Sequence, residues 1–393
     1  AWGNRLAFER AGITAASIAP AGGEIVKDAA GRPTGLLMNT ATRLLEAAMP
    51  EASPEKLESR IVTGLEAMAK GGYTMVHEAG VDSETMAALE NLASENKLPV
   101  SVYAMLSARD EPLLRNWLEW GPDTDGNDKL ITRAVKAFAD GALGSRGARL
   151  LEDYSDRPGH RGVSGAEYGF NRELVGKMMA AGFQVAIHAI GDAGNRETLD
   201  FIASVLRQHP EARASRHRIE HAQVVHPDDI GRFRQLGLIA SMQPPHAVED
   251  MAWAEQRLGP ERIKGAYAWR TLRQAGARLV FSSDLPGSSH DIFYGLHSAI
   301  TRQDRQGLPE GGWYPHQRMT PEEALRGYTT WAAASAFLED SAGTLAPGMW
   351  ADITVADIDP LNVGSTDPLS LLDGKVRMTL VRGAIVYDND QRQ

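Results

Sequence analysis

Two histidines stand at the ends of successive apolar segments that have the length of β-strands. His188 closes the run Gln184-Val-Ala-Ile-His188, and His221 closes the run His217-Arg-Ile-Glu-His221. If the two segments are neighbouring parallel strands, both imidazoles lie at the same edge of a sheet, within reach of one metal ion. A lone histidine at a strand end is more often an ordinary hydrogen-bonding residue. For the pair, metal binding and ordinary hydrogen bonding are therefore equally good interpretations.

Two further residues could complete such a site. Asp284 follows an apolar run and could bind a metal and accept a proton from water as a general base, or could merely begin the Leu-Pro-Gly turn after it. Lys136 has apolar neighbours, and partial desolvation should lower its pKa. Its neutral amine could take up carbon dioxide and become a metal-binding carbamate. An ion pair with Asp140 is the simpler alternative for Lys136.

We predict that five further polar residues near this edge contact a substrate: His77, Ser145, Arg146, Gln243 and His246. Ser145 and Arg146 lie in a Gly-rich loop, from which an arginine could reach a carboxylate or carbonyl group. Ordinary loop polarity is the alternative for all five. Glu220 precedes His221 by one residue and should face away from the site, because neighbouring residues of a strand point to opposite faces.

Alternating strands and helices have to position these residues. Between residues 73 and 282, seven strand-length apolar segments alternate with helical segments. This alternation is typical of βαβ units with a parallel sheet, whose strand ends gather on one face of a (β/α)8 barrel. We therefore predict an α/β fold of the TIM-barrel type. Seven strands are one short of closure, so the first strand is missing and we expect it before Ala1.

The order of helical and strand-like segments along the sequence predicts three regions. Residues 1–60 form a helical and loop segment that leads into the barrel, and residues 61–340 form the barrel itself. Residues 341–393 contain short β runs with turns and no helices between them, which indicates a small β-sandwich domain. Two or three strands do not make a stable sandwich alone, so this domain is only partial.

The composition excludes several classes of function. A net charge of −10 disfavours nucleic acid as a partner, and no apolar run approaches the roughly 18 residues of a membrane span. The absence of cysteine removes disulfides, thiolate nucleophiles and Cys-type zinc sites. No basic-then-apolar signal stretch is present. We expect a cytoplasmic protein that acts on a small molecule, contacts neither nucleic acid nor membrane, and is able to form a homo-oligomer.

Five motifs in the right order resemble amidohydrolase family 3, a family of metal-dependent hydrolases, in its N-substituted formamide deformylase-like branch. The motifs are Val135-Lys-Ala-Phe-Ala-Asp-Gly-Ala-Leu-Gly-Ser-Arg-Gly-Ala148, His188-Ala-Ile-Gly-Asp192, His217-Arg-Ile-Glu-His-Ala-Gln223, Ser283-Asp-Leu-Pro286 and Gly343-Thr-Leu-Ala-Pro-Gly-Met-Trp-Ala-Asp352. The resemblance runs through nearly the whole chain.

The resemblance implies an amidohydrolase that cleaves an amide-like C–N bond with a divalent metal ion, for which we predict zinc. Lys136 matches the family's fourth-strand lysine, which is often carboxylated. His188 and His221 match the ligands of the fifth and sixth strands. Asp284 matches the eighth-strand aspartate, which is both ligand and general base. The implied reaction is an attack by metal-activated water on the substrate carbonyl.

The sequence departs from the family pattern in one respect that bears on activity. The family's first barrel strand ends in a His-x-His pair that binds the more buried metal, and no His-x-His occurs here. The half of the β-sandwich that precedes the barrel is also absent, so the chain resembles a family member without its N-terminal part. A catalytically inactive barrel fragment with a binding role is the alternative from another class. A hydrolase of esters or cyclic amides is a third hypothesis.

Overall fold

A curled parallel sheet of seven strands forms the centre of the computed structural model, which describes residues 1–124 and 129–390. The strand order is β3-β4-β5-β6-β7-β8-β9, so every strand pairs with its neighbours in the sequence. The strands are β3 (Met75–Val81), β4 (Ser101–Ser107), β5 (Leu130–Phe138), β6 (Gln184–Ala189), β7 (Arg218–His221), β8 (Ile239–Met242) and β9 (Arg278–Phe281).

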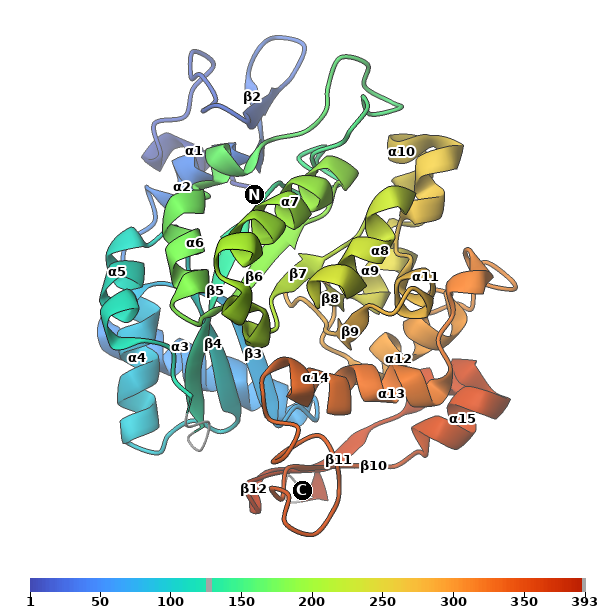
Figure 1. Cartoon of the computed structure of the whole chain (residues 1–393). Coiled ribbons are helices and arrows are strands. Elements are labelled where there is room, and N and C mark those ends of the chain that lie inside the picture. Colours follow the sequence, from blue (N-terminus) through green and yellow to red (C-terminus); the bar gives the residue numbers. More distant parts are fainter. Residues whose placement is uncertain (125–128, 391–393) are drawn as a thin grey trace.

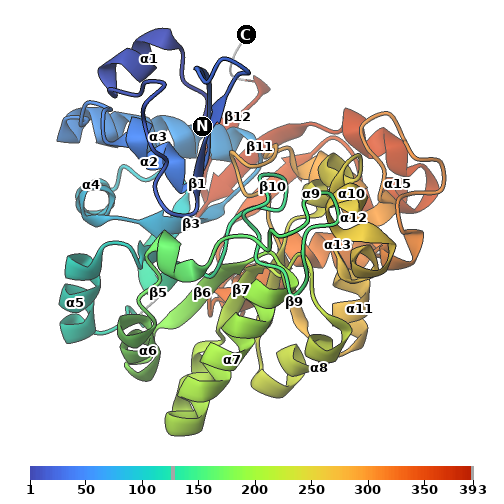
Figure 2. The same cartoon turned by 90° about the horizontal axis from the view of Figure 1, so that it is seen from above.

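The predicted α/β fold is confirmed as a half-barrel. Figures 1 and 2 show the sheet as a curved wall with helices along its outer side. Within the described residues, β3 and β9 are the two edges of the sheet and do not pair with each other. Among these residues the barrel is therefore not closed, in agreement with the count of seven strands.

Capped helices connect the strands. Asp82, Asp110 and Asn171 each accept a hydrogen bond from the backbone N–H three residues ahead, which fixes where the next helix begins. The helices between the strands are α4 (Ser83–Ser94), α5 (Glu111–Trp120), α6 (Arg172–Ala180), α7 (Asp192–Gln208), α8 (Pro227–Leu236), α9 (Pro244–Asp250), α10 (Ala254–Arg262) and α11 (Trp269–Gln274). After β9 follow α12 (Ile292–Thr301), α13 (Pro321–Tyr328), α14 (Thr330–Ser335) and α15 (Pro360–Thr366).

The two faces of the sheet have different environments. On the outer face, residues such as Val135, Val185 and Ile219 pack into the large core that the helices cover. On the inner face, Tyr103 and Ala186 belong to a separate small apolar cluster. Because side chains alternate along a strand, residues one position away from the outer core, such as Lys136 next to Val135, point inward.

Residues before β3 form a small unit with a core of its own. It contains α1 (Arg5–Arg10), the antiparallel hairpin of β1 (Gly23–Lys27) and β2 (Pro33–Asn39), and the short α2 (Arg43–Glu46). Its buried residues are Phe8, Ile13, Ile25, Leu37 and Ala41. The longer α3 (Pro54–Lys70) then leads to the sheet, and Ser53 caps its start.

The C-terminal residues form an antiparallel sheet in the order β10-β11-β12 (Ile353–Ala356, Val376–Val381, Ala384–Asp388). This sheet supports the predicted β domain in part, but the expectation of no helices between its β runs is wrong, because α15 (Pro360–Thr366) lies between β10 and β11. Thr379 Oγ1 donates to the carbonyl oxygen of Ala69 at 2.7 Å, and Thr354 Oγ1 donates to that of Gly72 at 2.6 Å. The sheet is thereby fastened to the end of α3. Among the described helices, none has the length and apolar character needed to cross a membrane.

Candidate metal centre

Three imidazoles meet at the carboxyl ends of β6, β7 and β8. The ring centroid of His221 lies 4.5 Å from that of His188 and 6.0 Å from that of His246. Burial lowers the pKa of all three histidines, that of His246 to about 4. They are therefore neutral near pH 7, and each keeps a nitrogen lone pair that can bind a metal.

Asp284 brings a carboxylate to the same place. It follows β9, has φ 56, and its Oδ2 lies 3.7 Å from His246 Nε2. One ligand-type atom each from His221, His246 and Asp284 lie within 4.8 Å of one another. Ligand atoms on one tetrahedral zinc ion stand roughly 3.4 Å apart, so small side-chain movements suffice. A donor set of two nitrogens and an oxygen fits a divalent cation.

Gln243 determines which nitrogen His221 offers. Gln243 Oε1 accepts from His221 Nδ1 at 2.8 Å, while Gln243 Nε2 donates to Ser282 Oγ at 2.9 Å and to the Ser241 carbonyl at 3.3 Å. Because Nδ1 carries the hydrogen, Nε2 of His221 is left unprotonated. A cavity of about 10 Å³ adjoins His221 and His246, which is about the space of one water molecule.

Lys136 lies on the inner face of β5 and is 5% exposed. Burial lowers its pKa, although the negative charges of Glu220 and Asp284 oppose this effect. Its own charge is near enough to lower the pKa of His188 and His221. In the described part of the chain no ion pair joins Lys136 to Asp140, so the structure does not support the simpler alternative for this lysine.

The prediction that Glu220 faces away from the site is wrong. Its carboxylate accepts two hydrogen bonds from Arg218, at 2.7 and 3.1 Å, and Arg218 also reaches Ser241 Oγ at 3.0 Å. Burial disfavours the charged carboxylate, but Arg218 and Lys136 still hold the pKa of Glu220 at about 2. Strand alternation places Glu220 inside, and the left-handed backbone of His221 (φ 76) turns the next side chain inward as well.

His77 does not end its strand, because β3 continues to Val81. It pairs in register with Tyr103, four residues before Ser107, which pairs with Lys136. His77 therefore lies deeper in the half-barrel than the metal-binding candidates. Its Nδ1 accepts from Arg218 at 2.9 Å, and burial, aided by the Arg218 charge, lowers its pKa to about 3. Here it supports the buried Arg218 side chain.

The predicted substrate residues of the Gly-rich loop have partners within the chain. Ser145 Oγ donates to Asn39 Oδ1 at 2.7 Å. Arg146 donates to both carboxylate oxygens of Asp156, at 3.1 and 2.7 Å. These contacts hold the loop against the N-terminal unit and against a later part of the same connection after β5. A direct role of Ser145 or Arg146 in substrate binding stays a prediction.

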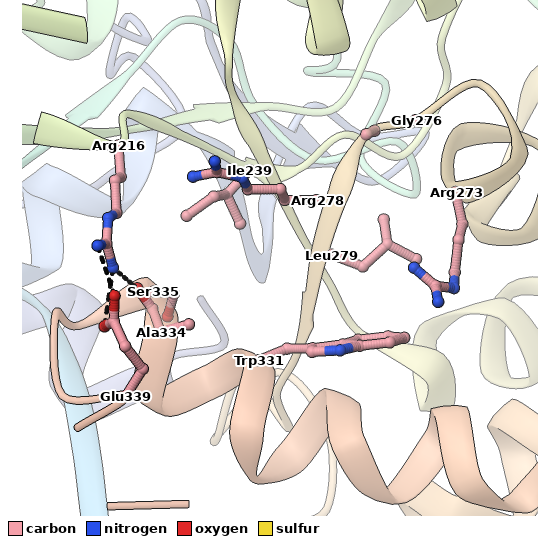
Figure 3. Close-up of a pocket in the computed structure, with 11 residues that line it drawn as sticks. Arg216, Ile239, Arg273, Gly276, Arg278, Leu279, Trp331, Ala334, Ser335 and Glu339 are labelled. Atoms are coloured by element: carbon pink, nitrogen blue, oxygen red, sulfur yellow. Dashed lines mark hydrogen bonds and ion pairs between the residues drawn. The ribbon is translucent and has the colours of Figure 1, made fainter. Parts of the chain in front are cut away.

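A wider cavity, of about 400 Å³, lies at the opposite, amino end of β7, β8 and β9 (Figure 3). Trp331 lines it, with the Arg273 guanidinium 4.6 Å from its ring, and Arg216 pairs with Glu339 at 2.6 Å. This lining contains no imidazole, and its one carboxylate is already paired with Arg216. The smaller cavity beside His221 is therefore the better candidate for chemistry.

Residues 1–387 match the model of the amidohydrolase family, Amidohydro_3. The chain belongs to the amidohydrolase family. It is 32% identical over 397 residues to the putative amidohydrolase YtcJ of Bacillus subtilis. The matched region covers 98% of this chain and 72% of YtcJ. It is 26% identical to N-substituted formamide deformylase of Arthrobacter pascens, over 98% of this chain and 71% of that protein.

Two solved structures of metal-dependent hydrolases have a similar fold. An uncharacterized metal-dependent hydrolase from Pyrococcus horikoshii is similar with a TM-score of 0.76 and 27% identity, over 93% of this chain and 70% of that one. A metal-dependent hydrolase from Pyrococcus furiosus is similar with a TM-score of 0.72 and 28% identity. The resemblance to amidohydrolase family 3 is confirmed, and these relatives support a metal-dependent hydrolase.

Proposed function

We propose that this amidohydrolase hydrolyses an amide-like C–N bond of a small molecule, with a divalent cation held at the carboxyl edge of the half-barrel. The observation that carries the proposal is the convergence of His221, His246 and Asp284, whose ligand-type atoms lie within 4.8 Å of one another. His188 and Lys136 stand beside this set and complete the proposed ligands. When bound, a cation such as zinc would lower the pKa of water and polarise a carbonyl group.

Asp284 is the proposed general base. Its side chain is 43% exposed, whereas the neighbouring His246 side chain is 15% exposed, so Asp284 stands at the solvent side of the set. Oδ2 of Asp284 would take a proton from the attacking water and pass it to the leaving nitrogen. The products are then a carboxylic acid and an amine, which balances the addition of one water molecule to the amide.

Lys136 is proposed to carry a carboxyl group. Its amine would combine with carbon dioxide to form a carbamate and release one proton. Burial among Phe138 and the apolar strand neighbours favours the neutral amine that this reaction requires. The carbamate would place a carboxylate on the inner face, toward the two imidazoles whose pKa values Lys136 already affects.

The substrate class rests on the relatives. N-substituted formamide deformylase of Arthrobacter pascens is 26% identical to this chain over 98% of this chain. This similarity supports a small N-substituted amide as substrate.

A second candidate function is a binding role without catalysis. The specific observation that favours it is the open sheet edge at β3 and β9 among the described residues.

Metal analysis and an activity assay test the proposal on the full chain. The purified protein is stripped with a chelator, reloaded with zinc, cobalt or manganese, and assayed with an N-substituted formamide, an ester and a cyclic amide. We expect the wild type to hydrolyse the formamide. Asp284→Asn should lower this turnover by about 10²- to 10⁴-fold. The control His209→Gln, which changes an exposed histidine, should keep wild-type turnover. Unchanged turnover in Asp284→Asn would contradict the assigned base. Metal binding without turnover of any compound would favour the binding role.

A further inference from the structure

A buried carboxylate that the proposed reaction does not use lies behind His188. Asp140, two residues after β5, is fully buried, with 0% of its surface exposed. Its Oδ1 accepts from the backbone N–H of Ile190 at 3.0 Å, and its Oδ2 accepts from those of Gly191 at 2.8 Å and Arg149 at 2.9 Å. The carboxylate thus joins the loop after β5 to the loop after β6.

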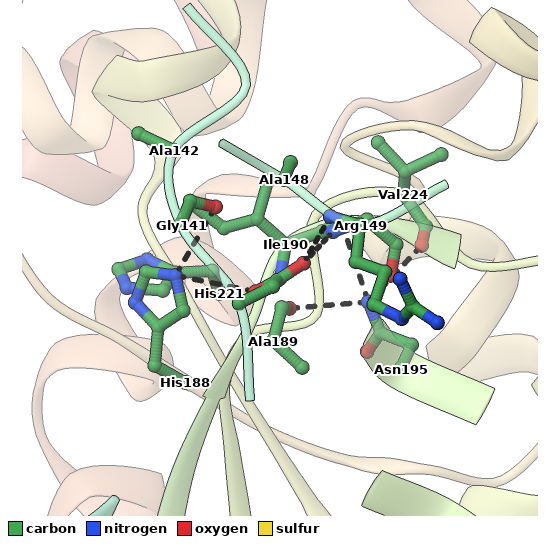
Figure 4. A network of polar contacts seen from close by, with 12 residues as sticks. Gly141, Ala142, Ala148, Arg149, His188, Ala189, Ile190, Asn195, His221 and Val224 are labelled. Carbon is green, nitrogen blue, oxygen red and sulfur yellow. Dashed lines mark hydrogen bonds and ion pairs between the residues drawn. The ribbon is translucent and has the colours of Figure 1, made fainter. Parts of the chain in front are cut away.

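The fourth neighbour of this carboxylate is the imidazole of His188. Its Nε2 lies 3.4 Å from Asp140 Oδ1 and 3.4 Å from the carbonyl oxygen of Gly141 (Figure 4). The carbonyl oxygen of Gly141 can only accept a hydrogen bond, so Nε2 carries the hydrogen, and Asp140 Oδ1 lies beside the same N–H group. Nδ1 of His188 is then the unprotonated nitrogen. An imidazole held in this way has a fixed tautomer and a fixed ring orientation.

We infer that Asp140 is a positioning residue, which selects the Nε2–H tautomer of His188 and turns Nδ1 toward the cation. This inference rests on the proposed metal centre and deepens it, because it names the group that orients one of its ligands. Asp140 itself touches neither the cation nor the substrate. The first turn of α7 lies beside Asp140 and also determines where its side chain can stand.

The start of α7 is shaped to hold the carboxylate. Ile190 and Gly191, which donate to Asp140, directly precede the helix, where partial positive charge favours an anion. Gly194 lies in the first turn of α7, and a Cβ atom at this position would lie 2.8 Å from Asp140 Cγ. A side chain at residue 194 would therefore push the carboxylate away from its donors. Gly194→Ala should therefore displace the Asp140 carboxyl group without removing it.

Asp192 offers a matched control from the same region. It is also buried, at 3% exposed, and also accepts two backbone hydrogen bonds, from Leu151 at 2.8 Å and Ala193 at 3.0 Å. Like Asp140, it connects the loop after β5 to the start of α7. No hydrogen bond or ion pair of the described residues joins Asp192 to a histidine. Asp192→Asn therefore disturbs the same loops without touching His188.

The experiment compares Asp140→Asn, Gly194→Ala and Asp192→Asn with the wild-type chain. In the metal-free state, ¹⁵N-histidine NMR reports which ring nitrogen of His188 carries the hydrogen. Zinc affinity is then measured by competition with a chromophoric chelator. We expect the Nε2–H tautomer in the wild type and in Asp192→Asn, and a mixture of tautomers in the other two. Zinc affinity should fall about 10- to 100-fold in Asp140→Asn and Gly194→Ala and stay at the wild-type value in Asp192→Asn.

Each outcome decides the inference. An Nδ1–H tautomer of His188 in the wild type overturns it, and so does an equal loss of zinc affinity in Asp192→Asn. If Asp140→Asn does not fold, Gly194→Ala and the wild-type tautomer still give the answer. If the wild type binds no cation, the proposed metal centre fails, whereas the NMR measurement continues to test the role of Asp140 on His188.

Discussion

His221 Nδ1 lies 2.8 Å from Gln243 Oε1, whereas His188 is held through its other nitrogen, Nε2. The two rings therefore present different nitrogens, Nδ1 of His188 and Nε2 of His221. Their planes stand at 71° with centroids 4.5 Å apart. Two imidazoles fixed in complementary tautomers can direct their lone pairs at a shared point, which is the arrangement that a bound cation needs.

Gln243→Leu should weaken zinc binding about ten-fold or more. The leucine cannot accept from His221 Nδ1, so the ring loses the partner that fixes its tautomer. Chelator competition measures the affinity. Gln317→Leu is the control, because Gln317 is also buried and makes two hydrogen bonds to Thr271 away from the histidines. Equal affinity losses in the two variants would contradict the role given to Gln243.

Glu220→Ala should destabilise the protein strongly. The Arg218–Glu220 pair is buried, with side chains 3% and 8% exposed, and removal of one partner leaves an unpaired charge. Such losses cost about 3–5 kcal/mol. Urea unfolding gives the free energy. Glu261→Ala breaks the exposed pair with Lys264 and should change it far less. A loss in Glu220→Ala as small as that in Glu261→Ala would mean that water reaches Arg218.

The strand pattern was the part of the fold that the sequence could predict well. Parallel strands buried on both faces are largely apolar, as the fully buried β4 illustrates, so their number and order can be predicted from the sequence. The positions of Lys136, His188, His221 and Asp284 near strand ends followed from the same pattern. Their common place at one end of the sheet agrees with that prediction, and their role as ligands stays a prediction.

What the sequence could not predict depends on local backbone geometry and on contacts across the fold. The inward position of Glu220 was missed because the left-handed φ of His221 is not visible in a strand pattern. His77 was misplaced because β3 runs four residues further than its apolar part. His246 was predicted to contact substrate. Its place beside Asp284 depends on α9 starting one residue after β8, for which Pro244 was the available signal.

A buried histidine outside the metal centre, His217, should make the protein less stable as the pH is lowered. Burial lowers the pKa of His217 to about 4, against an unfolded value of about 6.5. Between these values the unfolded chain binds a proton that the folded chain does not, so stability decreases as the pH falls. From about pH 7 to about pH 4.5, wild type should lose roughly 2.5 kcal/mol more than His217→Gln in urea unfolding. Parallel pH profiles of the two proteins would contradict a neutral buried His217.

The proposed carbamate at Lys136 should be detectable directly. Zinc-loaded protein in ¹³C-bicarbonate should give a carbamate carbon signal that Lys136→Met abolishes, because the apolar surroundings of Lys136 favour the amine that reacts with carbon dioxide. Lys129→Met is the control, since Lys129 is a half-buried lysine whose Nζ donates to the Leu98 carbonyl at 2.9 Å. Loss of the signal in Lys129→Met would assign the carbamate to Lys129 instead of Lys136. A zinc-loaded wild type without any signal would leave Lys136 as a plain amine, and the cation would then depend on the imidazoles and Asp284.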